Sequence, residues 1–342
     1  MIVGSSGVQS IADQPKAGRW AIALHGGAGN RSREMDRDER ESLERSLRGG
    51  LNAGKDILSS GGSSLDVVEA VVVMLEDDPQ FNAGKGAVFN RVGAHELDAS
   101  IMDGSTLRCG AVAGVKFVKN PIKAARLVME RSPHVLLAGE GADQFAIENG
   151  CERVTQDYFY TDRRFREMQD ALAKQGLEPL AKPAYSIHPH DPPTSDKPAL
   201  EGAGGTVGCV ALDSRGHLAA ATSTGGLTGK LPGRVGDTAI CGAGNYANKN
   251  CAVSATGRGE QYIRHSIAAK VAWLMAERRL TVDEAVRHCL DEILKPGDGG
   301  MIALDRDGKV SMHATTAAMP RGFADSTGRF ELAIWIDAQV SP

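Results

Sequence analysis

Two neighbouring runs of β-forming residues constrain the fold of this 342-residue chain more than any other feature. Residues 206–212 (TVGCVAL) and 218–222 (LAAAT) carry small or apolar side chains at nearly every position, without a polar face. Asp213-Ser214-Arg215-Gly216 joins them and is typical of a hairpin turn. Strands of this kind need cover on both faces. We therefore expect sheets that are packed between other layers.

Helical patterns elsewhere in the chain can supply that cover. A leucine repeat that follows one helical face predicts a first helix (Leu43, Leu47, Leu51 and Leu58). Further helices are expected at residues 65–76, 121–129 and 261–277 and after the capping box Thr281-x-x-Glu284, and further strands at 20–24 and 110–118. This order favours a layered α+β fold, with residues 1–342 forming a single domain.

Residues 182–198 differ in kind from the rest of the chain. They hold five of its 14 prolines. Proline interrupts a helix and a central strand alike. We expect an exposed, flexible linker at about residues 182–205.

Composition excludes several classes of partner. The chain has 39 basic and 43 acidic residues and a net charge of −4, which gives no electrostatic reason to expect a nucleic acid or a membrane surface. No apolar run approaches the ~18 residues of a membrane span, and the N-terminus lacks the pattern of a secretory signal. Six scattered cysteines without metal-ligand spacing favour free thiols in a reducing cytoplasm.

The junction Gly204-Gly205-Thr206, between the linker and a strand, carries the sharpest chemical hypothesis. A threonine that starts a strand is usually only a β-branched residue in a suitable place. Here, however, paired glycines permit strained backbone, and the linker could move away after cleavage. Cleavage before Thr206 would free an α-amine with a pKa of roughly 7.7–8, able to act as the base for its own hydroxyl.

Two later clusters have both a functional and a structural interpretation. Arg234 and Asp237 could grip the α-carboxylate and α-ammonium of an amino acid, or form a solvated surface pair. The stretch 254–260 (SATGRGE) could supply an oxyanion hole or a plain helix cap. The nine histidines show no triad or metal spacing, and we interpret His25, His95 and His134 as structural.

Taken together, the motifs resemble the plant-type (type III) L-asparaginase / isoaspartyl peptidase family of N-terminal-nucleophile hydrolases. The order and spacing of the motifs carry the resemblance along almost the whole chain. They are HGGAG (25–29), FNAGKGAVF (81–89), HELDASIMDG (95–104), RSPHVLLAGEGA (131–142), GTVGCVALD (205–213), ATSTGG (221–226), LPGRVGD (231–237) and SATGRGE (254–260).

The resemblance implies an αββα four-layer sandwich that cleaves itself between Gly205 and Thr206 into an α chain (1–205) and a β chain (206–342). It implies hydrolysis of L-asparagine and of β-aspartyl (isoaspartyl) dipeptides through a β-aspartyl-enzyme intermediate. The expected partners are these small molecules and a second copy, as a homodimer of cleaved units.

The same resemblance assigns roles by position. Thr206 is the expected nucleophile and Thr224 its neighbour, while the Thr256 hydroxyl and the Gly257 N–H are expected to form the oxyanion hole. The expected substrate contacts are Arg234, Asp237, Gly257, Gly259 and Asn82. No catalytic cofactor is expected, but a structural sodium ion is, held by main-chain carbonyls of Leu75, Glu76, Asp78, Phe81, Ala83 and Lys85.

Three other functions remain open at this point. A glycosylasparaginase-like enzyme fits the unpaired cysteines and missing signal poorly, and a threonine endopeptidase would use the same nucleophile. A non-catalytic metabolite-binding protein could use the glycine-rich loops as a ligand cradle. Self-cleavage separates this last class, because a binding protein stays a single chain.

Overall fold

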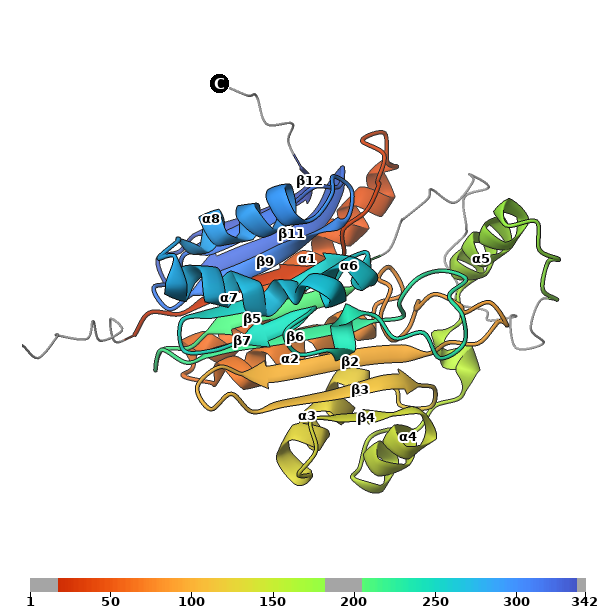
Figure 1. Ribbon diagram of the computed structural model, residues 1–342, viewed down its shortest axis with the longest axis horizontal. Helices are drawn as coiled ribbons and strands as arrows, with labels where there is room; N and C mark the ends of the chain where they lie inside the picture. The colour runs from red at the N-terminus through yellow and green to blue at the C-terminus, as the bar shows by residue number, and fades with distance from the viewer. Residues whose placement is uncertain (1–17, 182–204, 337–342) are drawn as a thin grey trace, which may run out of the picture.

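Two β-sheets packed face to face form the centre of the chain in the computed structural model, which describes residues 18–181 and 205–336 (Figure 1). The larger sheet has the strand order β12-β11-β1-β5-β6-β2-β3-β4, and the smaller has β10-β9-β8-β7. Neighbouring strands are antiparallel except for β3 and β4. The strands are β1 (Ala21–His25), β2 (Leu97–Asp103), β3 (Cys109–Val115), β4 (Leu136–Ala138), β5 (Val207–Leu212), β6 (Leu218–Thr224), β7 (Asn245–Ala247), β8 (Cys251–Gly257), β9 (Gly299–Asp305), β10 (Val310–Ala314), β11 (Ala318–Asp325) and β12 (Phe330–Trp335).

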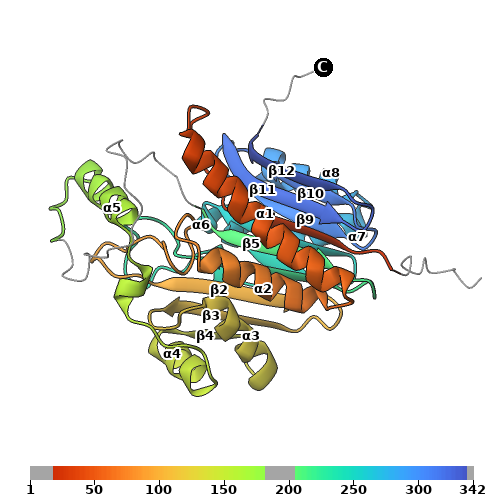
Figure 2. The same cartoon turned by 180° about the vertical axis from the view of Figure 1, so that it is seen from behind.

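Helices cover the outer face of each sheet (Figures 1 and 2). Helices α1 to α4 lie on the larger sheet, whereas α7 and α8 lie on the smaller one. The helices are α1 (Arg37–Ser59), α2 (Ser64–Glu76), α3 (Pro121–Arg131), α4 (Gly139–Glu148), α5 (Asp162–Lys174), α6 (Gly259–His265), α7 (Ile267–Glu277) and α8 (Val282–Arg287), with short helical turns η1 (Gln156–Phe159), η2 (Asp237–Ala239) and η3 (His288–Ile293). The four-layer αββα arrangement that the resemblance implied is therefore confirmed.

The position of strand β5 between two cores explains why its sequence is apolar on both faces. Val207, Cys209 and Ala211 belong to the core between the larger sheet and its helices, while Val210 and Leu212 belong to the core between the two sheets. Because both faces are buried, each position favours an apolar side chain, whose removal from water stabilises the fold. The predicted hairpin of β5 and β6 is confirmed, with Leu212 opposite Leu218.

The first two predicted helices are confirmed, including the leucine face of α1 and the Ser63 cap of α2. The prediction of one helix over 261–277 was wrong. The helix is interrupted at Ser266, whose left-handed backbone (φ 49°) separates α6 from α7. The first amides of α7, Ala268 and Ala269, donate to carbonyls of residues 242–243 and so fix its direction. Apolar residues continue across the break because both helices pack on the smaller sheet.

The predicted linker lies outside the described residues except for Gly205. The division into chains 1–205 and 206–342, and the single-domain interpretation, stay predictions. Within residues 18–181 and 205–336, no helix is long and apolar enough to cross a bilayer.

Candidate active site

Thr206 lies at the start of β5, directly across from the end of β6. The register that pairs Val207 with Ser223 places Thr206 beside Thr224. The Thr206 hydroxyl donates to the Thr224 hydroxyl at 3.0 Å, and the Gly226 amide donates to the same Thr224 oxygen at 3.0 Å. Thr206 is only 8% exposed. Two neighbouring strands therefore hold the predicted nucleophile and its predicted partner in contact.

The peptide that precedes Thr206 is enclosed by the loop after β1. A Cβ atom added at Gly27, whose φ is +99°, would lie 2.3 Å from the Gly205 Cα. This contact packs the glycine-rich loop at residues 25–29 tightly against the peptide before Thr206. On the other side, a Cβ at Gly205 would lie 2.9 Å from the Thr256 hydroxyl oxygen, which accepts the Ala28 amide at 3.0 Å.

Thr256 is thus beside the Gly205–Thr206 peptide and does not cap a helix. The stretch 254–260 does lead into a helix, as the cap interpretation expected, but the N-cap of α6 is Arg258, without a side-chain cap bond. Gly257 follows Thr256 at the end of β8, where a Cβ would come within 2.1 Å of the Asp298 carbonyl. The backbone at this corner therefore requires glycine.

A chain of hydrogen bonds behind the nucleophile was missed by sequence reasoning. The Ser254 hydroxyl contacts His25 Nε2 and the Thr222 hydroxyl, each at 2.8 Å. Burial lowers the pKa of His25 to about 3, against the raising effect of the Thr206 backbone carbonyl. A neutral ring agrees with the structural interpretation of His25. Only the positions of these residues inside recognised motifs hinted at their closeness.

Arg234 and Asp237 meet at Gly259. A Cβ atom added there would lie 2.8 Å from Asp237 Oδ1 and 3.0 Å from Arg234 Nη2. Arg234 also pairs with Glu260 through Nε and Nη2 at 3.0 and 3.2 Å, a partner that sequence reasoning did not assign. Burial raises the pKa of Asp237 to about 7, and its Oδ2 has no hydrogen-bond partner among the described residues. These two side chains are not a solvated surface pair.

Asn82 lies between two groups of residues: the Arg234–Asp237 pair, called the clamp below, and Thr206 with its neighbour Thr224. Its amide nitrogen donates to the Gly226 carbonyl at 2.8 Å, and its amide oxygen accepts from Val88 at 2.9 Å. Gly226 contacts both groups. Its amide donates to the Thr224 hydroxyl, and a Cβ atom added to it would lie 3.1 Å from Arg234 Nη1. Asn82 therefore holds backbone at the junction of the two groups.

The turn predicted to hold sodium gathers main-chain oxygens. A Cβ at Gly84 would lie 2.4 Å from the Glu76 carbonyl oxygen, and one at Gly86 would lie 2.4 Å from that of Pro79 and 2.9 Å from that of Phe81. The Glu76 carbonyl accepts the Lys85 amide at 2.7 Å. Carbonyl oxygens suit a hard cation, and the structure holds these three close to the backbone of Gly84 and Gly86.

Comparison with known proteins places the chain in a family. A family model described as asparaginase matches residues 18–334. The chain is similar to an isoaspartyl peptidase of Escherichia coli (46% identity; 91% of this chain and 95% of that protein), a probable isoaspartyl peptidase/L-asparaginase 2 of Arabidopsis thaliana (42%; 93% and 99%) and an isoaspartyl peptidase/L-asparaginase of Rattus norvegicus (39%; 92% and 90%). With the αββα layers and a threonine at the start of β5, these matches establish that the chain belongs to the asparaginase family of N-terminal-nucleophile hydrolases.

Proposed function

We propose that the protein cleaves itself before Thr206 and then hydrolyses L-asparagine and β-aspartyl dipeptides. The observation that carries this proposal is the convergence of Thr224, Thr256 and the Gly27 loop on the Gly205–Thr206 peptide. The names of the relatives supply the substrates. An arginine and an acid that meet beside this site match the α-carboxylate and α-ammonium shared by both substrates.

Maturation begins with attack of the Thr206 hydroxyl oxygen on the Gly205 carbonyl carbon. The peptide C–N bond breaks, its nitrogen takes a proton, and an ester joins the Gly205 carbonyl to the Thr206 oxygen. Water then hydrolyses the ester and leaves the Gly205 carboxylate and a Thr206 α-amine. Thr256, whose oxygen lies beside Gly205, is positioned to stabilise the transient oxyanion.

In the mature enzyme the Thr206 amine takes the proton of its own hydroxyl. The oxygen attacks the side-chain carbonyl of the substrate, with the Thr256 hydroxyl and the Gly257 N–H receiving the negative charge. The amine then protonates the leaving group, which departs as ammonia or as an amino acid. Water hydrolyses the resulting β-aspartyl ester and releases aspartate.

Paired substrates test this function directly. The purified protein should release ammonia from L-asparagine and leucine from β-Asp-Leu, whereas α-Asp-Leu should remain intact because its scissile carbonyl is displaced relative to the clamp. The Thr206→Ala variant should have no activity. Equal hydrolysis of the α- and β-linked dipeptides, or an active Thr206→Ala variant, would contradict the proposal.

We further propose that the turn at residues 75–85 holds a structural monovalent cation through the main-chain carbonyl oxygens of Leu75, Glu76, Asp78, Phe81, Ala83 and Lys85. The carbonyl oxygens gathered around Gly84 and Gly86 support this. Such an ion would stiffen the segment that leads to Asn82 and would take no part in bond breaking. Thermal unfolding in sodium against choline chloride at equal ionic strength tests the site: a higher Tm in sodium is expected, and equal Tm values would count against it.

Assembly and location are proposed with the function. We expect a homodimer of cleaved units, which sedimentation of the mature protein would detect. Leu227 and Leu231, 42% and 57% exposed beside the site, are apolar surface that such an interface could cover. Six scattered thiols suit a reducing compartment, so we place the protein in the cytoplasm.

A further inference from the structure

Two buried carboxylates at the start of β2 belong to a motif, HELDASIMDG, that the proposed chemistry does not use. Glu96 is 4% exposed and Asp98 is fully buried. They are two residues apart, the spacing that places side chains on one face of a strand. Buried charges are costly unless they are paired and hydrogen-bonded. What these carboxylates bind should therefore explain their presence.

Both carboxylates hold the segment that carries Arg234. Glu96 Oε2 accepts the Gly233 amide at 3.1 Å, and Asp98 Oδ2 accepts the Gly236 amide at 3.3 Å. The two amides lie on either side of Arg234 in the chain. Asp98 is also the register partner of Thr224 in the β2–β6 pair. The start of β2 thus connects the clamp to the nucleophile.

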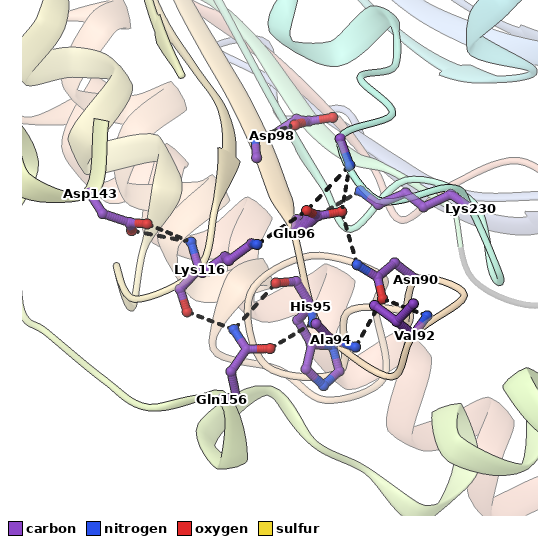
Figure 3. A network of polar contacts seen from close by, with 12 residues as sticks. Asn90, Val92, Ala94, His95, Glu96, Asp98, Lys116, Asp143, Gln156 and Lys230 are labelled. Carbon is purple, nitrogen blue, oxygen red and sulfur yellow. Dashed lines mark hydrogen bonds and ion pairs between the residues drawn. The ribbon is translucent and has the colours of Figure 1, made fainter. Parts of the chain in front are cut away.

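Lys230 lies close to the Glu96 backbone and to Arg234. Its side chain is buried, and its Nζ donates to the Glu96 main-chain oxygen at 2.7 Å (Figure 3). A Cβ atom added at Gly226 would lie 3.0 Å from Lys230 Nζ and 3.1 Å from Arg234 Nη1, so both cations adjoin the same glycine. Burial lowers the pKa of Lys230, while the charges of Asp98 and Glu96 act in the opposite direction.

The arrangement gives Lys230 a specific electrostatic role. Burial raises the pKa of Asp98, and the nearby positive charges of Lys230 and Arg234 act to lower it. If the Lys230 charge were absent, Lys116 would still pair with Glu96, but Asp98 would be left to attract the Arg234 guanidinium. An arginine drawn to an internal carboxylate is less available to a carboxylate in solution.

We propose that Lys230 is a positioning residue that offsets the charges of Glu96 and Asp98 and thereby keeps Arg234, which Glu260 holds through Nε and Nη2, in place to bind the α-carboxylate of the substrate. The inference rests on the proposed function, because it assigns Arg234 to that carboxylate. Lys230 acts through Arg234 and need not touch the substrate. Its loss should therefore weaken substrate binding while leaving the Thr206 chemistry intact.

Lys116 provides a matched control. Its Nζ lies 3.4 Å from Glu96 Oε1, on the other side of this carboxylate from Lys230 (Figure 3). The Lys116 side chain is 42% exposed. Lys116→Met and Lys230→Met each remove one positive charge beside Glu96, the first at its carboxylate and the second at its main-chain oxygen, but only Lys230 adjoins Gly226 and Arg234.

The experiment measures kcat, KM and Tm for β-Asp-Leu with mature wild-type and variant proteins. Lys230→Met should raise KM by about tenfold or more, as loss of one member of a buried charged pair does, with little change in kcat. Lys116→Met should match the wild type. The double variant Lys230→Met/Asp98→Asn should restore part of the lost substrate affinity, because the competing carboxylate is gone. A merely structural role of Lys230 would appear as a parallel loss of Tm and kcat, and not in KM alone.

Several results would contradict the proposed role of Lys230. An unchanged KM in Lys230→Met, a parallel loss of kcat and Tm, or a double variant worse than the single one overturns the inference. If Lys230→Met does not mature, the double variant still should; failure of both would make Lys230 a folding residue and also overturn it. A wild type inactive on both substrates would instead contradict the proposed function itself.

Discussion

The backbone of Gly27 lies against that of Gly205, so that a Cβ atom added at Gly27 would fall 2.3 Å from the Gly205 Cα and 2.5 Å from its carbonyl carbon. No side chain can be accommodated there without moving the peptide that precedes Thr206. We predict that Gly27→Ala matures far more slowly than the wild type, as followed by the appearance of two chains on a denaturing gel.

Gly150→Ala is the control for this variant. Gly150 has nearly the same φ, +98° against +99°, but a Cβ there would meet nothing within 4 Å. Both variants carry a backbone strain of about 1–3 kcal/mol, and only Gly27→Ala adds the contact with Gly205. Equal maturation of the two variants would show that this contact does not position the scissile peptide.

Asp237 should impose a pH dependence on substrate capture. Burial raises its pKa from 3.8 to about 7, and binding of the substrate ammonium requires the charged carboxylate. The Thr206 amine, with a pKa of roughly 7.7–8, must also be unprotonated. We therefore predict that kcat/KM falls below pH 7 with a slope steeper than one on a logarithmic plot. In Asp237→Asn the slope should return towards one; an unchanged slope would remove Asp237 from the clamp.

The same group should affect stability with the opposite trend. The folded pKa of Asp237 lies above the unfolded value, so the folded protein binds more protons between pH 4 and 7. Its contribution to the free energy of unfolding is present at low pH and is lost as pH rises through about 7. Asp237→Asn should therefore gain more Tm relative to the wild type at pH 8 than at pH 5. A difference in Tm that does not change with pH would contradict the assignment.

Arg234→Lys tests the shape of the clamp. A lysine keeps the charge but cannot form the paired hydrogen bonds of a guanidinium. We predict that the variant matures, because autocleavage involves no free α-carboxylate. We also predict that kcat/KM for β-Asp-Leu falls, corresponding to a loss of roughly 2–5 kcal/mol in transition-state stabilisation. Arg264→Lys, at an exposed position of α6, is the control. Near wild-type turnover of Arg234→Lys would place the carboxylate elsewhere.

The sequence predicted those parts of the fold that depend on local pattern. The leucine face of α1, the hairpin of β5 and β6, and the capping box at Thr281 follow from periodicity and turn chemistry, and each is confirmed. The break at Ser266 could not be predicted, because the hydrogen bonds that redirect α7 come from carbonyls of residues 242–243.

In the candidate site, too, some residues could be predicted from the sequence and some contacts could not. Thr206 could be proposed as the nucleophile from its glycines and the strand that follows it, and Arg234 and Asp237 as candidate substrate contacts from their chemistry. The Arg234–Glu260 pair and the contact of Lys230 with Glu96 join residues distant in sequence, and only the register of strands and loops brings them together. Periodicity and spacing carry no information about such contacts.

Intact-mass spectrometry of the purified protein tests the central claim most directly, because the nucleophile depends on one peptide bond. We predict two chains, residues 1–205 and residues 206–342 with Thr206 at the new N-terminus, and a single chain in Thr206→Ala. A wild type that hydrolyses β-Asp-Leu as one uncut chain, or that is cut at another bond, would contradict the account.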